Sequence, residues 1–275
     1  MEIEEMNSPE ASYIDLHCHL VAGVDDGAAT ENETQHMLEL ARNDGIGTIV
    51  ATPHLFSSHS SEKDPAVVFE KVEALVQACS APDAPVKVVP GAEVFFDSNL
   101  FDYLMEFKHH LTLNHSSYFL LEFPFNFIFH GASDFMYRVM MEGLIPVIAH
   151  VERNSVMQRN PRLVYEMAQM GVLCQVNAAS FDGYFGEVAE DTARLLLKHN
   201  LVHVIASDAH SATERRPEFS STIARLESEG FQQAGMLAAD VPHAIIHDEG
   251  VPDTGVAEDP SRQKSIFDFF RKKFK

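Results

Sequence analysis

Residues 13–28 read YIDLHCHLVAGVDDGA, a short apolar run that ends in two histidines and leads into two adjacent aspartates. The run has the length and composition of a β-strand, whose alternation places His17 and His19 on one face and Cys18 on the other. A lone strand-end histidine is more often structural than a ligand, but a pair on one face can bind a single metal ion. Which interpretation holds depends on the residues that end the other strands.

Short apolar runs recur along the chain, and amphipathic stretches separate most of them. We predict further strands at 46–54, 86–94, 118–124, 145–152, 173–180 and 202–210, and helices at 30–44, 65–79, 132–143, 161–171, 186–200 and 217–230. Seven strands that mostly alternate with helices predict an α/β fold with a parallel sheet, closed into a barrel or nearly so.

The composition limits the classes of function. The chain has 275 residues, is 45% hydrophobic and carries a formal charge of -21, so we expect a sizeable core and no nucleic-acid binding on the main body. Its three cysteines are odd in number and show no CxxC spacing, which favours a reduced, cytoplasmic protein. No apolar run approaches the ~18 residues that cross a bilayer.

Metal-ligating residue types gather where the predicted strands end. Because chemistry in barrels of this type is located at the carboxyl ends of the strands, we expect these side chains to form one site. Imidazole and carboxylate without thiolate suit Mn, Fe or Zn, and so many ligands predict two or three divalent ions with bridging carboxylates. The candidate metal ligands are His17, His19, Asp25, His54, Glu93, Glu122, His150, Asp208 and His210.

Two arginines lie close to these ligands in the sequence. Arg153 follows His150, and Arg215 follows His210. A guanidinium group presents a planar set of donors that suits phosphate, so metals with arginines at one rim predict phosphate-ester hydrolysis. Taken singly, each arginine could equally be an ordinary surface charge, and the chemistry alone does not separate Arg215 from the adjacent Arg216.

An ordered set of motifs over residues 13–230 resembles a known superfamily. The motifs are DLHCHLVAGVDDGA, TIVATPH, PGAEVFFD, FLLEFP, GLIPVIAHVERN, QVNAASFDGYFG and HVIASDAHSATERRP. They resemble the polymerase and histidinol phosphatase (PHP) superfamily, and within it the CpsB/YwqE-type manganese-dependent protein-tyrosine phosphatases of bacterial capsule and exopolysaccharide systems. The resemblance implies a distorted seven-stranded (β/α) barrel and a trinuclear site.

The resemblance also implies roles for individual residues. One ion would take His17, His19, Glu93 and Asp208, a second Glu93, Glu122 and His150, and a third Asp25, His54 and His210. Arg153 and Arg215 would be the catalytic, phosphate-binding residues. The segment after His150 reads VERN where the family usually shows PERY, which bears on substrate detail and leaves the ligand and the arginine in place.

The implied reaction is hydrolysis of phosphotyrosine on a protein. The expected substrate is an autophosphorylating, membrane-associated tyrosine kinase that controls polysaccharide chain length. An alternative enzyme would act on a small phosphate ester such as histidinol phosphate. A binding module that acts through its tail is the non-enzymatic alternative, which the intact ligand set disfavours because unused buried carboxylates cost stability.

The two ends of the chain differ from the body. We predict an acidic leader at 1–12, a metallophosphatase domain at 13–240, and a loose tail at 241–275 that ends in a basic amphipathic helix. Residues 261–275 contain six Lys or Arg and one Asp. Such a helix could lie on the inner face of the membrane, pack on an acidic partner or dock on its own domain. The segment QKSIFDFF also resembles a sliding-clamp-binding peptide, without support from the rest of the chain.

Overall fold

The computed structural model describes residues 13–82, 84 and 86–261. Within them, strands alternate with helices along most of the chain. The strands are β1 (Tyr13–Cys18), β2 (Ile46–Ala51), β3 (His54–Leu55), β4 (Lys87–Pro90), β5 (Glu93–Phe95), β6 (Tyr118–Glu122), β7 (Ile145–Ile148), β8 (Leu173–Asn177) and β9 (Val204–Ala206).

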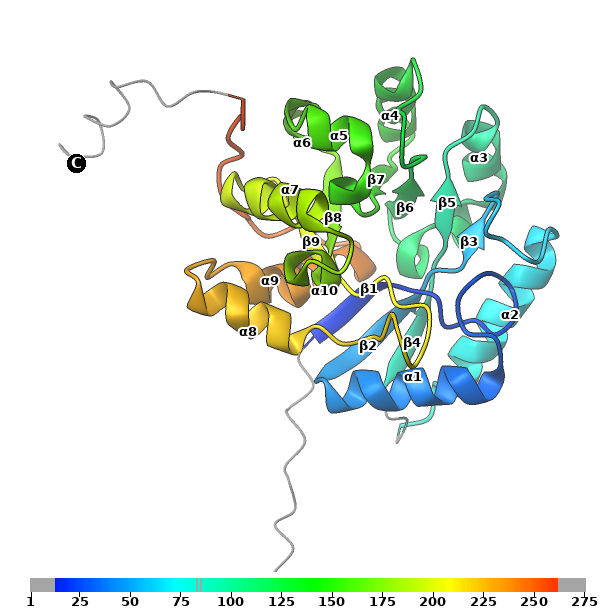
Figure 1. The fold of residues 1–275 in the computed structure, drawn as a ribbon. Helices are drawn as coiled ribbons and strands as arrows, with labels where there is room; N and C mark the ends of the chain where they lie inside the picture. Colours follow the sequence, from blue (N-terminus) through cyan, green and yellow to red (C-terminus); the bar gives the residue numbers. More distant parts are fainter. Residues whose placement is uncertain (1–12, 83, 85, 262–275) are drawn as a thin grey trace, which may run out of the picture.

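All of these strands pair in parallel, as the alternation with helices predicts. One sheet has the order β1-β2-β4, and a six-stranded sheet has the order β3-β5-β6-β7-β8-β9. A bridge between Cys18 and Ala209, with a 2.8 Å hydrogen bond from His19 N to the Ala209 carbonyl, brings the end of β1 beside the segment after β9. The result is a mixed α/β fold around a curled parallel sheet (Figure 1).

The expected count of seven strands in one barrel is not confirmed, because the described strands form two sheets. The predicted strand 46–54 is split into β2 and β3 at Pro53, which has no N–H to donate to a neighbour. The predicted strand 86–94 is split into β4 and β5 at Gly91. A side chain there would bring a Cβ to 2.7 Å from Val50 Cγ1, so the close approach of β2 requires glycine.

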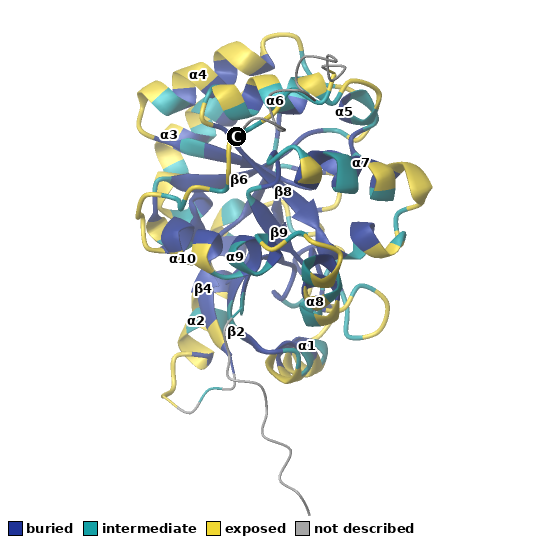
Figure 2. Ribbon diagram, turned by 90° about the vertical axis from the view of Figure 1, so that its left-hand side faces the viewer, coloured by how far each residue is buried: buried dark blue, intermediate teal, exposed yellow. Residues whose placement is uncertain are grey.

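The helices cover the outside of the curled sheet, with their apolar residues buried against the strands and their polar faces exposed (Figure 2). The helices are α1 (Glu31–Asn43), α2 (Pro65–Ala78), α3 (Leu100–Leu111), α4 (Ala132–Met141), α5 (Ser155–Arg159), α6 (Arg162–Gln169), α7 (Glu187–Lys198), α8 (Ser220–Ser228), α9 (Ala234–Ala238) and α10 (Asp240–Ile246), with 3-10 turns η1 (Leu113–His115), η2 (Val151–Arg153) and η3 (Ala178–Asp182).

Thr30 is the N-cap of α1 as predicted, but the Glu33 carboxylate binds the N–H of the preceding residue, Ala29, and not that of Thr30 as a capping box would. The Thr30 hydroxyl accepts a hydrogen bond from Glu33 N at 3.2 Å, and the Glu33 carboxylate accepts one from Ala29 N at 3.0 Å. Gly45 follows the helix in the left-handed conformation, with a φ of +86°. Helix α3 was not predicted, although Leu100, Leu104 and Leu111 form a buried stripe at helical spacing.

The folded body continues past residue 240, where we expected a loose tail to begin. Helix α10 buries Val241, Ile245 and Ile246 against the core. The segment that follows lies on the body, since Glu258 N donates to the carbonyl of His199 at 2.9 Å. Residues 1–12 lie outside the described residues, as do residues 262–275 of the basic helix predicted at 261–275. Among the described helices, none is long and apolar enough to span a membrane.

Candidate metal centre

The parallel sheet brings the carboxyl ends of its strands together, and the predicted ligands lie there. His17 is on β1, His19 directly follows it, and Glu122 ends β6. His54 follows the end of β2 and begins β3, and Glu93 follows the end of β4 and begins β5. His150 follows β7, and Asp208 and His210 follow β9. Each of these side chains is buried, with at most 8% of its surface exposed.

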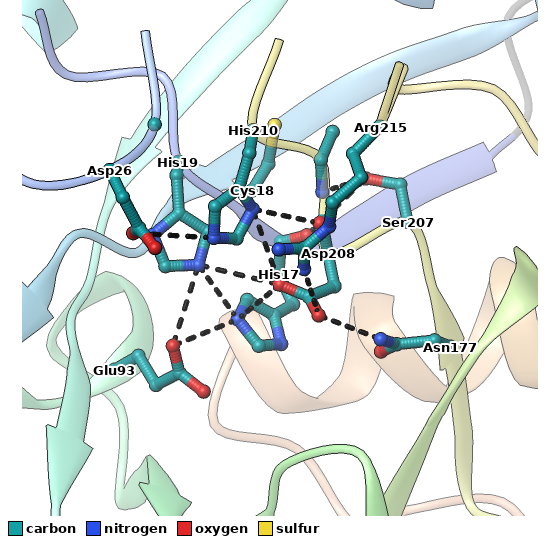
Figure 3. A network of polar contacts seen from close by, with 12 residues as sticks. His17, Cys18, His19, Asp26, Glu93, Asn177, Ser207, Asp208, His210 and Arg215 are labelled. Atoms are coloured by element: carbon teal, nitrogen blue, oxygen red, sulfur yellow. Dashed lines mark hydrogen bonds and ion pairs between the residues drawn. The ribbon is translucent and has the colours of Figure 1, made fainter. Parts of the chain in front are cut away.

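The first cluster surrounds the His-x-His pair. Nε2 of His17 and Nε2 of His19 are 3.1 Å apart and face one carboxylate oxygen of Asp208, at 3.4 and 3.5 Å. The same two nitrogens lie 3.3 and 3.4 Å from Glu93 Oε2 (Figure 3). Two imidazole nitrogens and two carboxylate oxygens therefore point at one position, as the ligands of a cation do.

A second cluster centres on Glu93 and Glu122. Glu93 Oε1 is 3.0 Å from His150 Nε2, and Glu93 Oε2 is 2.9 Å from His54 Nδ1. Glu122 lies 3.6 Å from His54 Nδ1 and 3.9 Å from His150 Nε2. His54, Glu93 and Glu122 each offer an atom to one group that could hold an ion.

In the third cluster the structure contains Asp26, where we expected Asp25. One oxygen of Asp26 is 3.5 Å from Nε2 of His54 and 3.5 Å from Nε2 of His210, and these three residues with His19 form a group that could hold an ion. Asp25 instead accepts from His19 Nδ1 at 2.8 Å and from the backbone N–H of His54 at 2.9 Å. It is positioned to orient His19 from behind.

Close contacts leave no room for a side chain at Gly27, which directly follows the two aspartates. A Cβ on Gly27 would lie 2.4 Å from His19 Cβ and 2.9 Å from Asp25 Oδ1. The loop therefore passes directly against the His-x-His segment. From this position Asp25 reaches Nδ1 of His19, and Asp26 reaches Nε2 of His54 and of His210.

The chemistry of these side chains fits divalent cations. Glu93 Oε2, Glu122 Oε2 and His54 Nδ1 are buried, and none of them forms a hydrogen bond among the described residues, although Glu93 Oε2 and His54 Nδ1 lie 2.9 Å apart. Burial, reinforced by the neighbouring Glu93 and Asp208, raises the pKa of Glu122 to about 9. Burial also acts to raise the pKa of Glu93, but His17 and His54 outweigh it and lower that pKa well below the usual range. Carboxylates this crowded and this dry need positive charge to remain ionised together.

The two predicted arginines meet on the other oxygen of Asp208. Arg153 donates to Asp208 Oδ2 at 2.9 Å, and an Arg215 nitrogen lies 2.5 Å from the same atom. Nε of Arg215 is buried and has no hydrogen-bond partner among the described residues, so this guanidinium group has a donor to spare. Arg216 points elsewhere and pairs with Glu218 at 2.8 Å, which separates the two arginines that the sequence left equivalent.

Aromatic side chains surround Arg153. Its guanidinium carbon lies 4.6 Å from the ring centroid of Phe125 and 4.1 Å from that of Phe185. Phe125 also stacks on His150, with ring centroids 5.4 Å apart, and is 37% exposed. Tyr184, next to Phe185, is 52% exposed. The arginines therefore lie at the border between the buried ligands and an open, aromatic part of the surface.

Three further residues at the site were missed from the sequence. Gln175 and Asn177 on β8 are fully buried against the clusters, and no signal of charge or histidine marks that strand. His59, whose Nδ1 is 3.2 Å from Asp26 Oδ2, also stacks on His54. Cys18 is buried as predicted, and burial raises the pKa of its thiol well above the usual value.

The chain is similar to one protein family over most of its length. The family model for capsular polysaccharide synthesis, CpsB/CapC, matches residues 13–247. The tyrosine-protein phosphatase YwqE of Bacillus subtilis (strain 168) is 31% identical over 257 residues, which cover 94% of this chain and 100% of the relative. The tyrosine-protein phosphatase CpsB of Streptococcus pneumoniae is 31% identical over 242 residues, which cover 86% and 99%.

Solved structures are also similar to this chain. A structure from a crystallographic study of YwqE from B. subtilis and CpsB from S. pneumoniae, described as unique metal-dependent tyrosine phosphatases, superposes with a TM-score of 0.80 at 31% identity, covering 89% of this chain and 99% of that chain. The histidinol phosphate phosphatase of Lactococcus lactis, with zinc, superposes with a TM-score of 0.51 at 14% identity, covering 82% of this chain and 94% of that one, which indicates a shared fold alone.

Proposed function

The chain belongs to the CpsB/CapC family of capsular polysaccharide synthesis proteins, and we propose that it is a metal-dependent protein-tyrosine phosphatase. Its reaction is hydrolysis of the phosphate ester of phosphotyrosine in a protein substrate. The observation that carries this assignment at the level of chemistry is the position of Asp208. One of its oxygens faces the histidines of the first cluster and the other faces both arginines.

The proposed cofactors are two or three divalent cations, with Mn preferred and Fe or Zn as alternatives. When bound, such ions would polarise a phosphoryl group and lower the pKa of a coordinated water molecule, so that hydroxide is available at neutral pH. The buried oxygens Glu93 Oε2 and Glu122 Oε2, which form no hydrogen bond among the described residues, support this. The proposed ligands are His17, His19, Glu93 and Asp208 for one ion, Glu93, Glu122 and His150 for a second, and Asp26, His54 and His210 for a third.

Arg153 and Arg215 are proposed to bind the phosphate. In the structure both guanidinium groups pair with Asp208, and a phosphate dianion would compete with that carboxylate for their donors. Their positive charge would then oppose the charge that develops on the phosphoryl oxygens during transfer. All three cysteines are buried, so none is accessible as a nucleophile, and hydrolysis assisted by metal ions does not need one.

The open aromatic surface beside Arg153 favours an aryl phosphate on a protein over a small aliphatic one. Phe125, Phe127 and Tyr184 are 37%, 44% and 52% exposed, and such rings contact another aromatic ring favourably. We also propose that the substrate is a membrane-associated tyrosine kinase met at the cytoplasmic face of the membrane. The link of the family to capsular polysaccharide synthesis supports this choice.

The proposed function is tested by hydrolysis of three substrates with added Mn²⁺: a phosphotyrosine peptide, the matching phosphoserine peptide and histidinol phosphate. We expect phosphotyrosine to be cleaved at least ~100-fold faster, and a chelator or His210→Ala to abolish this, because removing a ligand or the ion removes transition-state stabilisation. Arg216→Ala serves as the control for Arg215→Ala, which should lose activity. Cleavage of histidinol phosphate alone would leave the metal chemistry intact and contradict the proposed substrate.

A further inference from the structure

Strand β8 lies between the strands that lead to two of the candidate ligands. It pairs with β7, which leads to His150, on one side and with β9, which leads to Asp208, on the other. Gln175 and Asn177 are two residues apart on β8, so their side chains share one face of the strand. Both are fully buried, and neither offers the charge or imidazole typical of a metal ligand.

The contacts of the Gln175 and Asn177 side chains determine which atom of each amide donates a hydrogen bond and which accepts one. The backbone N–H of His150 can only donate, and it lies 2.8 Å from the Gln175 side chain, so the atom there is the oxygen, Oε1. The Gln175 NH₂ group then donates to Asn177 Oδ1 at 2.8 Å. This leaves the Asn177 NH₂ group to donate to Asp208 Oδ2 at 2.7 Å (Figure 3).

The same direction fixes the proton of His17. Its Nδ1 is 3.2 Å from Gln175 Oε1, which accepts, so Nδ1 must carry the hydrogen. In the neutral imidazole the lone pair is then on Nε2, which faces His19, Glu93 and Asp208. An uncharged amide thus holds the imidazole in the tautomer that can bind a cation.

The backbone around the ligands also needs support. His150 and Asp208 have positive φ values, +32° and +53°, which L-residues adopt only where the surroundings hold them there. The Gln175 oxygen binds the backbone of His150, and the Asn177 amide binds the side chain of Asp208.

We propose that Gln175 and Asn177 form an amide relay that positions His17, His150 and Asp208 together for cation binding. The relay consists of the hydrogen bonds His17–Gln175–Asn177–Asp208 and the bond from Gln175 to the His150 backbone. Its two members are positioning residues, since they act through the ligands. The proposal rests on the metal centre of the proposed function, and its tests use cation binding and an imidazole proton as readouts.

The first test measures Mn²⁺ affinity by calorimetry on the full chain. Gln175→Met and Asn177→Leu should each weaken binding about 10- to 100-fold, the range for loss of a hydrogen-bond partner behind a ligand. The double variant should be no weaker than the worse single variant, because each substitution already breaks the relay.

Thr192→Val is the matched control for loss of a buried hydrogen bond. Thr192 is 5% exposed and donates to the Val188 carbonyl at 2.7 Å, away from the clusters. It should destabilise the fold slightly and leave Mn²⁺ affinity unchanged. Folded Gln175→Met and Asn177→Leu variants that bind Mn²⁺ within twofold of the parent chain would overturn the relay.

The second test detects the His17 proton directly, by ¹⁵N NMR on the chain loaded with diamagnetic Zn²⁺. We expect a slowly exchanging Nδ1–H signal, assigned by its loss in His17→Gln, that persists in Thr192→Val and exchanges faster in Gln175→Met. A proton on Nε2 of His17, or an unchanged signal in Gln175→Met, would overturn the proposal. A chain that binds Mn²⁺ and passes these tests without cleaving phosphotyrosine would overturn the proposed function and leave the relay intact.

Discussion

At the scale of single residues, the candidate metal centre contains two buried carboxylates, Glu93 and Glu122, whose pKa values are shifted in opposite directions. Glu93 is held ionised by His17 and His54, whereas burial and the neighbouring carboxylates raise the pKa of Glu122 to about 9. Without cations, Glu122 therefore keeps a proton in the folded chain, and it releases that proton on unfolding at any pH between its ordinary pKa of 4.5 and about 9. This residue carries a cost in stability that cation binding can offset.

The sign of this cost gives a pH prediction for the chelator-treated chain. As pH rises from about 4.5 towards 9, the unfolded state loses the Glu122 proton first, so the free energy of unfolding falls. In Glu122→Gln the cost is absent, and we expect the melting temperature to rise by about 5 °C at pH 8 and by much less at pH 5. Scanning calorimetry at both values checks this, with the exposed Glu73→Gln as control. An equal difference at pH 5 and pH 8 would contradict it.

Adjacent residues show where sequence reasoning at this scale stops. The strand-end histidines and carboxylates were predictable, because alternation and parallel topology bring them to one rim. Choosing between Asp25 and Asp26 was not possible, because both lie on a loop whose path depends on the contact of Gly27 with His19. The roles of Gln175 and Asn177 depend on which strands flank β8, and that is a property of the folded sheet.

At the scale of elements, the loop between η3 and α7 brings an aromatic side chain onto both arginines. The ring centroid of Phe185 is 4.1 Å from the guanidinium carbon of Arg153 and 5.7 Å from that of Arg215. Cation–π contacts of this kind are worth about 0.5–2 kcal/mol and restrict the plane of the guanidinium. The loop therefore helps to hold the proposed phosphate-binding groups ready.

Phe185→Leu is expected to raise KM for a phosphotyrosine peptide about tenfold, with a smaller effect on kcat, because the arginines lose a surface that orders them before the phosphate arrives. Steady-state kinetics with Mn²⁺ measure both constants. Tyr137→Leu, on helix α4 and 62% exposed, removes an aromatic ring that makes no contact with the arginines and should leave both constants unchanged. A KM for Phe185→Leu equal to that of the parent would refute the role of the loop.

The elements themselves were predictable to different degrees. Helices with a capping residue and a terminal glycine, such as α1, match their predicted bounds closely, because those signals are local. The division of β2 from β3 depends on a proline, and that of β4 from β5 on the close contact of Gly91 with the side chain of Val50 on β2. Helix α3 has no side-chain hydrogen bond at its N-cap, and helix α10 follows an apolar stretch without a clear period.

At the scale of the whole molecule, a chain with a formal charge of -21 concentrates buried carboxylates at one end of a parallel sheet. The curl of the sheet brings β1 beside the segment after β9, so His17 lies 3.4 Å from Asp208 although the two are far apart in the sequence. Asp208 then connects the cation-binding clusters to the arginines, and the exposed aromatic residues lie outside them. Asp208 is thus the carboxylate shared by the candidate metal centre and the proposed phosphate site.

The most direct test is a crystal structure of the chain with Mn²⁺ and phosphate, with anomalous diffraction to locate the ions. We expect two or three manganese ions among the strand-end clusters, Asp26 in contact with the ion beside His54 and His210, and Asp25 still hydrogen-bonded to His19. We also expect a phosphate bound by Arg153 and Arg215. Manganese absent from these clusters, or phosphate bound away from both arginines, would contradict these expectations.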